Sequence, residues 1–235
     1  MLNKDDVNRA YTGVDAVYHI CSVFNPKEVE IGKIAINVAK EKEIKHFVYH
    51  SVLHSILHSM PHHEKKHIVE ELIIDSGIPY TIIQPSAFMQ NIMESWNSLQ
   101  IEGIFRQKLF TSNKTRMCMI DLDDLAEAVA NIITNDKHIG ATYELCGANL
   151  SLCDMIEIFS KQLGKEITVD VPDDKQIEVN LKKVGFSDYY ISSLITMFHH
   201  YNKQGFVGNC NTLTWILGRN PHNFEDFIRK IKQNY

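Results

Sequence analysis

The first half of the chain alternates short apolar runs with longer stretches in which apolar side chains recur at helical spacing. The short runs have the length of buried strands and lie at residues 14–21, 46–52 and 80–85. Residues 26–42 and 61–76 carry apolar side chains every three or four positions, which predicts two amphipathic helices. Strands and helices that alternate through short loops are typical of a parallel sheet with right-handed crossovers. The pattern therefore predicts an α/β fold with a Rossmann-type parallel sheet.

The second half begins with the same alternation and then becomes mainly helical. An apolar run at residues 117–120 leads into the acidic segment 121–124, which is typical of the start of a helix. Residues 140–146 predict one more strand, and helical spacing dominates beyond it. We therefore expect a Rossmann-type core over residues 1–147 and a smaller, mainly helical C-terminal region over residues 148–235.

Composition argues against several classes of function. The 235 residues carry a formal net charge of −5, so the chain has no electrostatic reason to bind nucleic acid or anionic lipid directly. No apolar run reaches the roughly 20 residues of a membrane span, and residues 1–6 do not start a secretory signal. These features predict a cytoplasmic protein. The five scattered cysteines form no C-x-x-C pair and are expected to be reduced, mostly structural thiols.

Ligands of parallel α/β sheets bind outside the carboxyl ends of the strands. Three strand ends are therefore expected to line one common edge, and their residues are Cys21, Ser22, Ser51, Val52, Pro85, Ser86, Ala87 and Phe88. The hydroxyls of Ser51 and Ser86 are suited to hydrogen bonds with a sugar or an amide of a ligand. The alternative is that both hydroxyls only satisfy backbone groups of the turns in which they lie.

Six segments of the chain form an ordered set with specific spacing. They are residues 46–54 (HFVYHSVLH), 61–66 (PHHEKK), 76–85 (SGIPYTIIQP), 88–91 (FMQN), 120–126 (IDLDDLA) and 221–227 (PHNFEDF). This set resembles the NmrA-like family of atypical short-chain dehydrogenases/reductases over nearly the whole chain. The resemblance implies binding of NADP or NAD on a Rossmann core. It also implies either a reductase of small quinone or carbonyl compounds or a redox-sensing regulator with a protein partner.

The resemblance assigns roles to several residues. It places Lys66 at the nicotinamide ribose as a catalytic and cofactor-binding residue and makes the strand ends cofactor contacts. Phe88 and Asn91 are candidate walls of the substrate pocket on the side of the C-terminal region, and the alternative for Phe88 is core packing. The tyrosine of a Y-x-x-x-K motif is lacking, and His62 and His63 stand before the lysine instead. An imidazole there is a potential proton donor near neutral pH. The alternative is that Lys66 and both histidines lie on the solvated face of the helix.

The sequence departs from the family pattern at its start. Family members begin with a strand and a G-x-x-G-x-x-G turn that holds the pyrophosphate, and this sequence contains no such turn. The resemblance aligns residues 6–17 with the segment entering the fourth strand, so an N-terminally truncated fold is expected. The strand at residues 14–21 is then an unpaired edge, which favours self-association. Cofactor binding is expected only with the missing segment, and the alternative is a fragment without cofactor binding or activity.

One motif is expected to be accidental. Residues His63 to His67 match H-E-x-x-H, a spacing that places two imidazoles on one helical face above a zinc ion. However, two lysines lie between the histidines, no third ligand has a recognisable motif, and the context of strands and helices is Rossmann-like. No metal site is predicted.

Overall fold

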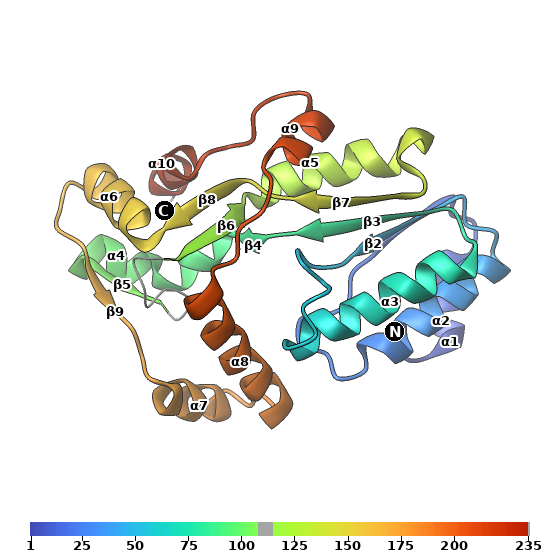
Figure 1. The fold of residues 1–235 in the computed structure, drawn as a ribbon, viewed down its shortest axis with the longest axis horizontal. Helices are drawn as coiled ribbons and strands as arrows, with labels where there is room; N and C mark the ends of the chain where they lie inside the picture. The colour runs from blue at the N-terminus through green and yellow to red at the C-terminus, as the bar shows by residue number, and fades with distance from the viewer. Residues whose placement is uncertain (108–114, 235) are drawn as a thin grey trace. The chain divides into compact units, whose positions relative to one another are not determined.

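The computed structural model describes residues 1–107 and 115–234. They group into two compact units (Figure 1). The first unit consists of residues 1–85 and 126–145, and the second lies within residues 86–125 and 146–235. This grouping differs from a single division at residue 147, because residues 86–125 pack with the C-terminal residues. None of the helices in the described ranges is long and apolar enough to cross a membrane.

The first unit is built on a four-stranded sheet with the strand order β1-β2-β3-β7. Its strands are β1 (Ala16–His19), β2 (His46–His50), β3 (Tyr80–Pro85) and β7 (Ala141–Leu145). All three neighbouring pairs are parallel, which confirms the predicted Rossmann-type sheet. In the part of the chain that is described, β1 lies at one end of this sheet, where an edge strand was expected.

Helices α2 (Glu28–Glu41) and α3 (Pro61–Ser76) of the first unit lie side by side, with α1 (Lys4–Tyr11) next to α2 (Figure 1). A Cβ atom on Gly32 of α2 would lie 2.8 Å from Cγ2 of Val69 in α3, so the glycine permits this close packing. Gly77 ends α3 in the left-handed region with φ of 72°, as predicted. The core between helices and strands includes Val38, Ala39, Phe47, Val69 and Ile73.

The second unit combines short strands with several helices. Its three-stranded sheet has the order β4-β6-β8, and β5 pairs with β9. The strands are β4 (Ala87–Phe88), β5 (Ile104–Arg106), β6 (Arg116–Ile120), β8 (Ala148–Ser151) and β9 (Thr168–Asp170). The helices are η1 (Met89–Ser95), α4 (Trp96–Glu102), α6 (Leu152–Leu163), α7 (Asp174–Lys183), α8 (Asp188–Gln204), α9 (Asn211–Leu217) and α10 (Phe224–Asn234). Helix α5 (Leu122–Ile133) begins here and continues into the first unit, where η2 (Asp136–His138) follows it.

Two buried aspartates attach the start of α5 to other parts of the second unit, Asp124 to the C-terminal residues and Asp121 to η1. The carboxylate of Asp124 accepts hydrogen bonds from Nη2 of Arg219 at 2.8 Å and from the backbone N–H of His222 at 2.6 Å. Asp121 accepts one from Nε2 of Gln90 at 2.6 Å. Both carboxylates are almost fully buried and have lost their hydrogen bonds to water. The hydrogen bonds to these partners replace them.

Replacement of Asp124 should test this attachment. In Asp124→Asn the charged hydrogen bonds to Arg219 and to the backbone N–H of His222 are weakened, so the free energy of unfolding should fall by about 2 kcal/mol. Urea denaturation followed by circular dichroism measures the change. The control is Asp123→Asn, which removes an exposed carboxylate paired with Lys230 and should change the free energy by less than about 1 kcal/mol. Equal losses in both variants would contradict the assignment.

Candidate functional site

Lys66 lies in α3 with its ammonium group at the carboxyl end of β2. Nζ donates a hydrogen bond to the carbonyl oxygen of His50 at 2.8 Å and lies 2.9 Å from Oε1 of Glu28. It also lies 5.1 Å from the centre of the Tyr49 ring, within range of a cation–π interaction. Only 11% of the Lys66 side chain is exposed. The lysine is therefore a buried cation at a strand end, and the alternative of a solvated helix face is wrong for it.

Glu28 is the counter-charge of this lysine. It lies in the first turn of α2, where a carboxylate interacts favourably with the helix dipole, and it is buried. Its Oε1 accepts a hydrogen bond from the Tyr49 hydroxyl at 2.9 Å as well as the contact with Lys66. Burial is the main cause, and the nearby Glu28 carboxylate the next, of the rise in the pKa of the Cys21 thiol to about 12. Cys21 is therefore a protonated thiol at neutral pH.

A second buried carboxylate, Glu70 of α3, fixes the end of β2 and the loop after it. It accepts hydrogen bonds from the Ser51 hydroxyl, from Oγ of Ser55 at 2.7 Å and from Nε2 of Gln84 at 2.9 Å. Gln84 belongs to β3, so Glu70 connects the ends of two neighbouring strands. The Ser51 proton is thereby directed into the protein, which leaves the Ser51 oxygen as an acceptor for any ligand.

Three histidines near Lys66 are held neutral by their surroundings. Burial, assisted by the Lys66 charge, lowers the pKa of His19 to about 4 and that of His50 to about 3. Burial, His63 and Lys66 lower the pKa of His62 to about 2. Nδ1 of His50 lies 2.5 Å from the Tyr18 hydroxyl, and the ring of His19 stacks on neighbouring aromatic rings. The ion pair of Lys66 is thus surrounded by uncharged imidazoles.

His62 and His63 do not lie on a solvated helix face either. His63 is fully buried, and its Nδ1 lies 2.9 Å from the carbonyl oxygen of His54. The His62 ring packs against Phe24 and His63. Both rings face the protein because α3 turns this side towards the loop that precedes it. In residues 1–107 and 115–234, no cluster of three or more His, Cys, Asp or Glu side chains is arranged to hold a metal ion.

The residues expected at the site fall into both units. The first unit contains Cys21, Ser22, Ser51, Val52, Lys66 and Pro85, and the second contains Ser86, Ala87, Phe88 and Asn91. Within the first unit, Glu28 lies next to both Cys21 and Lys66, and Lys66 binds the carbonyl oxygen of His50, which precedes Ser51. The carbonyl oxygen of Pro85 accepts a hydrogen bond from the N–H of Leu53 at 3.0 Å. Oγ of Ser22 accepts one from Asn25 instead. In the second unit, Ala87 and Phe88 form β4.

Sequence reasoning missed Glu28, Glu70 and Gln84. A signal was present, because Glu70 follows Val69 and stands three positions before Ile73 on the apolar side of α3, and Gln84 interrupts an apolar strand. A carboxylate or amide on the buried face of an element needs an internal partner. That rule would have pointed to a polar network below the strand ends.

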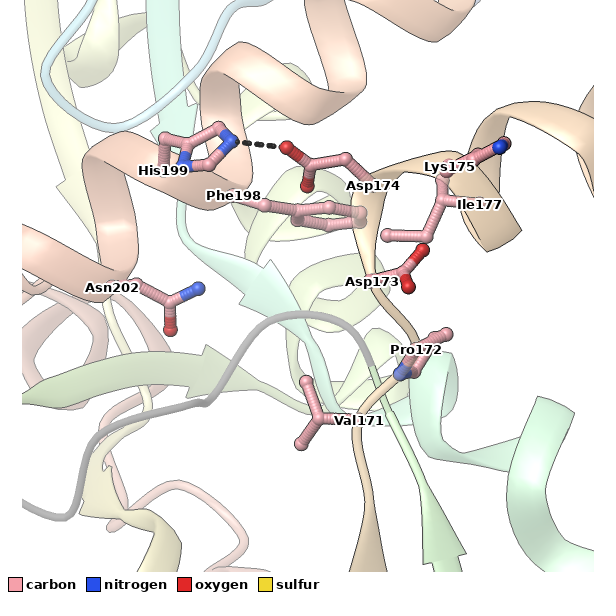
Figure 2. A pocket seen from close by; sticks show the side chains of 9 residues that line it. All are labelled: Val171, Pro172, Asp173, Asp174, Lys175, Ile177, Phe198, His199 and Asn202. Carbon is pink, nitrogen blue, oxygen red and sulfur yellow. Dashed lines mark hydrogen bonds and ion pairs between the residues drawn. The ribbon is translucent and has the colours of Figure 1, made fainter.

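A hollow of about 580 Å³ lies elsewhere, within the second unit, between α7 and α8 (Figure 2). Its apolar side chains come from Val171, Pro172, Ile177 and Phe198. The His199–Asp174 ion pair lies at its margin with 2.8 Å between Nε2 and Oδ2. The expected site residues do not belong to its described lining.

The neutral histidines make the stability of the first unit sensitive to acid. His19 stays neutral when folded down to pH about 4, whereas the unfolded chain binds a proton below about 6.5, so acidification favours unfolding. In His19→Phe, which keeps an aromatic ring at this place, the loss of unfolding free energy between pH 6.5 and 4.5 should be about 2 kcal/mol smaller than in the parent chain. Denaturant titrations at both pH values measure this, and the exposed His199→Gln is the control. Parallel curves for His19→Phe and the parent would show that His19 is not buried as a neutral ring.

The chain was compared with known proteins. The NmrA-like family model matches residues 1–228. Quinone oxidoreductase 2 of Escherichia coli is 25% identical over 210 residues, which are 89% of this chain and 72% of the relative. NAD(P)H azoreductase of Xenophilus azovorans is 22% identical over 226 residues, which are 94% of this chain and 76% of the relative.

Solved structures show the same fold. The NADPH complex of an NADPH-dependent quinone oxidoreductase from Escherichia coli gives a TM-score of 0.83 at 23% identity, over 98% of this chain and 81% of that chain. The NADP complex of NmrA, a negative transcriptional regulator, gives 0.78 at 17% identity, over 97% of this chain and 77% of that chain. These likenesses agree with the parallel sheet and the extent of the family match. The chain belongs to the NmrA-like family.

Proposed function

We propose that this chain binds NADP or NAD and reduces small quinone or carbonyl compounds. The observation that carries the proposal is the buried ammonium group of Lys66 at the end of β2, where ligands of parallel sheets bind. Its contacts with Glu28 and with the carbonyl oxygen of His50 involve two of its three N–H groups, which leaves one for a ribose hydroxyl. The names of the relatives, a quinone oxidoreductase and an azoreductase, support a redox activity.

The described residues fit one end of the dinucleotide better than the other. Lys66 and the Ser51 oxygen suit the nicotinamide ribose, since they offer a charged donor and an acceptor at neighbouring positions. The pyrophosphate needs consecutive backbone N–H groups in a glycine-rich turn. Most glycines with positive φ in the described ranges instead follow helices, as Gly77, Gly103, Gly164 and Gly218 do. We therefore assign the nicotinamide end to these residues and leave the pyrophosphate unassigned.

Each residue near Lys66 has a proposed part in the reaction. A bound reduced nicotinamide would supply the hydride. Lys66 would bind and orient the ribose, and Glu28 would hold the lysine in that direction through their ion pair. The low pKa of about 2 keeps His62 neutral, so it does not supply the proton that carbonyl reduction needs at neutral pH. The strand-end residues of the second unit, Ser86 to Phe88, and Asn91 stay predicted ligand contacts.

The second candidate function is that of a regulator that senses the redox state of the cofactor. It is favoured by the absence of an acidic proton donor next to Lys66 in α3, since His62 is neutral and a tyrosine is lacking in this helix. Such a protein would bind the dinucleotide without turning it over and pass its state to a protein partner. That partner, and self-association through the edge strand β1, stay predictions.

Titration calorimetry of NADPH and NADH on the 235-residue chain tests cofactor binding. We expect Lys66→Met to weaken binding about tenfold or more, because it removes a charged hydrogen-bond donor. Lys65→Met is the matched control, since it removes the neighbouring lysine of the same helix and should leave the affinity unchanged. Circular dichroism confirms that both variants fold.

Turnover with a small quinone then separates the two candidate functions. NADPH oxidation that depends on quinone and is lost in Lys66→Met would support the reductase. Cofactor binding without turnover would favour the regulator. Failure of the parent chain to bind either dinucleotide would contradict both and would favour a fragment that has no cofactor affinity.

A further inference from the structure

Three of the five cysteines come together in the second unit, although they are far apart in sequence. Cys118 lies in β6, Cys146 lies just before β8, and Cys210 lies just before α9. The thiols of Cys146 and Cys210 lie close enough to Cys118 to shift the pKa of its thiol. The proposed cofactor chemistry uses none of these groups.

Bonds that do not involve sulfur hold Cys210 next to Cys118. In the antiparallel pair β6–β8, Cys118 lies opposite Asn149, so their side chains share one face of the sheet. Nδ2 of Asn149 donates to the carbonyl oxygen of Gly208 at 2.9 Å and lies 3.6 Å from Sγ of Cys210. The backbone N–H of Cys118 donates to the carbonyl oxygen of Phe206 at 2.6 Å. These bonds hold residues 206–210 next to β6 and keep the thiols of Cys118 and Cys210 near each other.

The cysteines differ in their access to solvent. Cys118 and Cys146 are fully buried, Cys210 is partly exposed, and Cys153 is exposed. A reagent in solution therefore reaches Cys210 before it reaches Cys118. An accessible thiol next to a buried second thiol is the arrangement in which a mixed disulfide is resolved within the protein.

We infer that Cys118 and Cys210 form a reversible disulfide by exchange with a low-molecular-weight disulfide such as oxidised glutathione. The Cys210 thiol loses its proton to solvent, and its thiolate attacks one sulfur of oxidised glutathione. This forms a mixed disulfide and releases the first glutathione thiolate, which takes up a proton. The Cys118 thiolate then attacks the Cys210 sulfur and releases the second glutathione. Two protein thiols are oxidised, and one glutathione disulfide is reduced to two thiols.

The exchange should be slow at neutral pH. The neighbouring Cys146 thiol is the largest of the influences that raise the pKa of Cys118 to about 12, and the neighbouring Cys118 thiol and burial also raise the pKa of Cys210. Few thiolates are present at pH 7, so the rate should rise about tenfold per pH unit between pH 7 and 9. The disulfide therefore forms slowly and, once formed, links residues 206–210 covalently to β6.

Peptide mapping after oxidation tests the inference. The full chain with Cys153→Ser is treated with oxidised glutathione at pH 8, quenched with acid, alkylated and digested with trypsin. Cys118 lies in the tryptic peptide 117–137, Cys210 in 204–219, and Cys146 in 138–161. We expect a cross-link between peptides 117–137 and 204–219, loss of two titratable thiols, and a melting temperature raised by about 5–10 °C until dithiothreitol is added.

Two variants in the same background serve as controls. Cys118→Ser should stop at glutathionylated Cys210, and Cys118→Ala provides the same test if the serine disturbs the fold. Cys146→Ser should still form the cross-link. The inference is overturned by a link between peptides 117–137 and 138–161, by glutathionylated Cys210 that persists while Cys118 is present, or by unchanged thiol content. Cofactor binding plays no part in this experiment, so its result is independent of the proposed function.

Discussion

The ion pair between Lys66 and Glu28 is the interaction on which the strand ends of the first unit depend. Two opposite charges are removed from water here, and their desolvation is offset only because both find further partners. Glu28 binds Tyr49, and Lys66 binds the backbone of His50, so the pair connects α2, α3 and β2. The positive charge in turn disfavours protonation of the surrounding imidazoles. One interaction thereby sets both the geometry and the charge of this edge of the sheet.

Glu70 complements this pair as a second buried carboxylate of the first unit. Three neutral donors, from Ser51, Ser55 and Gln84, hold its carboxylate. The two carboxylates lie on different helices and bind side chains at neighbouring strand ends. Side chains of α2 and α3 therefore hold the strand ends in place. A rigid edge of this kind suits a site that must hold a ligand in one orientation.

Much of the fold could be predicted from the pattern of apolar residues, because strands β1, β2 and β3 are apolar runs and helices α2 and α3 are long enough to show a period. The short elements could not. Strand β4 has 2 residues and helices α4 and α9 have 7 each, so each covers at most about two periods of its pattern. Lys66 was found through the family resemblance alone. Its partner Glu28 was missed because spacing arguments treat a carboxylate at the start of a helix as a solvated cap.

The grouping of the chain into two units has a consequence for how the protein is made. The polypeptide passes between the units three times, after residues 85, 125 and 145. Strand β7, which pairs with β3, leaves the ribosome only after the intervening residues 86–125 have been synthesised. Until then β3 is an unpaired apolar edge in a nascent chain, and such edges invite aggregation. Neither unit can be produced as one uninterrupted segment, so the two should fold as interleaved parts of a single process that is vulnerable during translation.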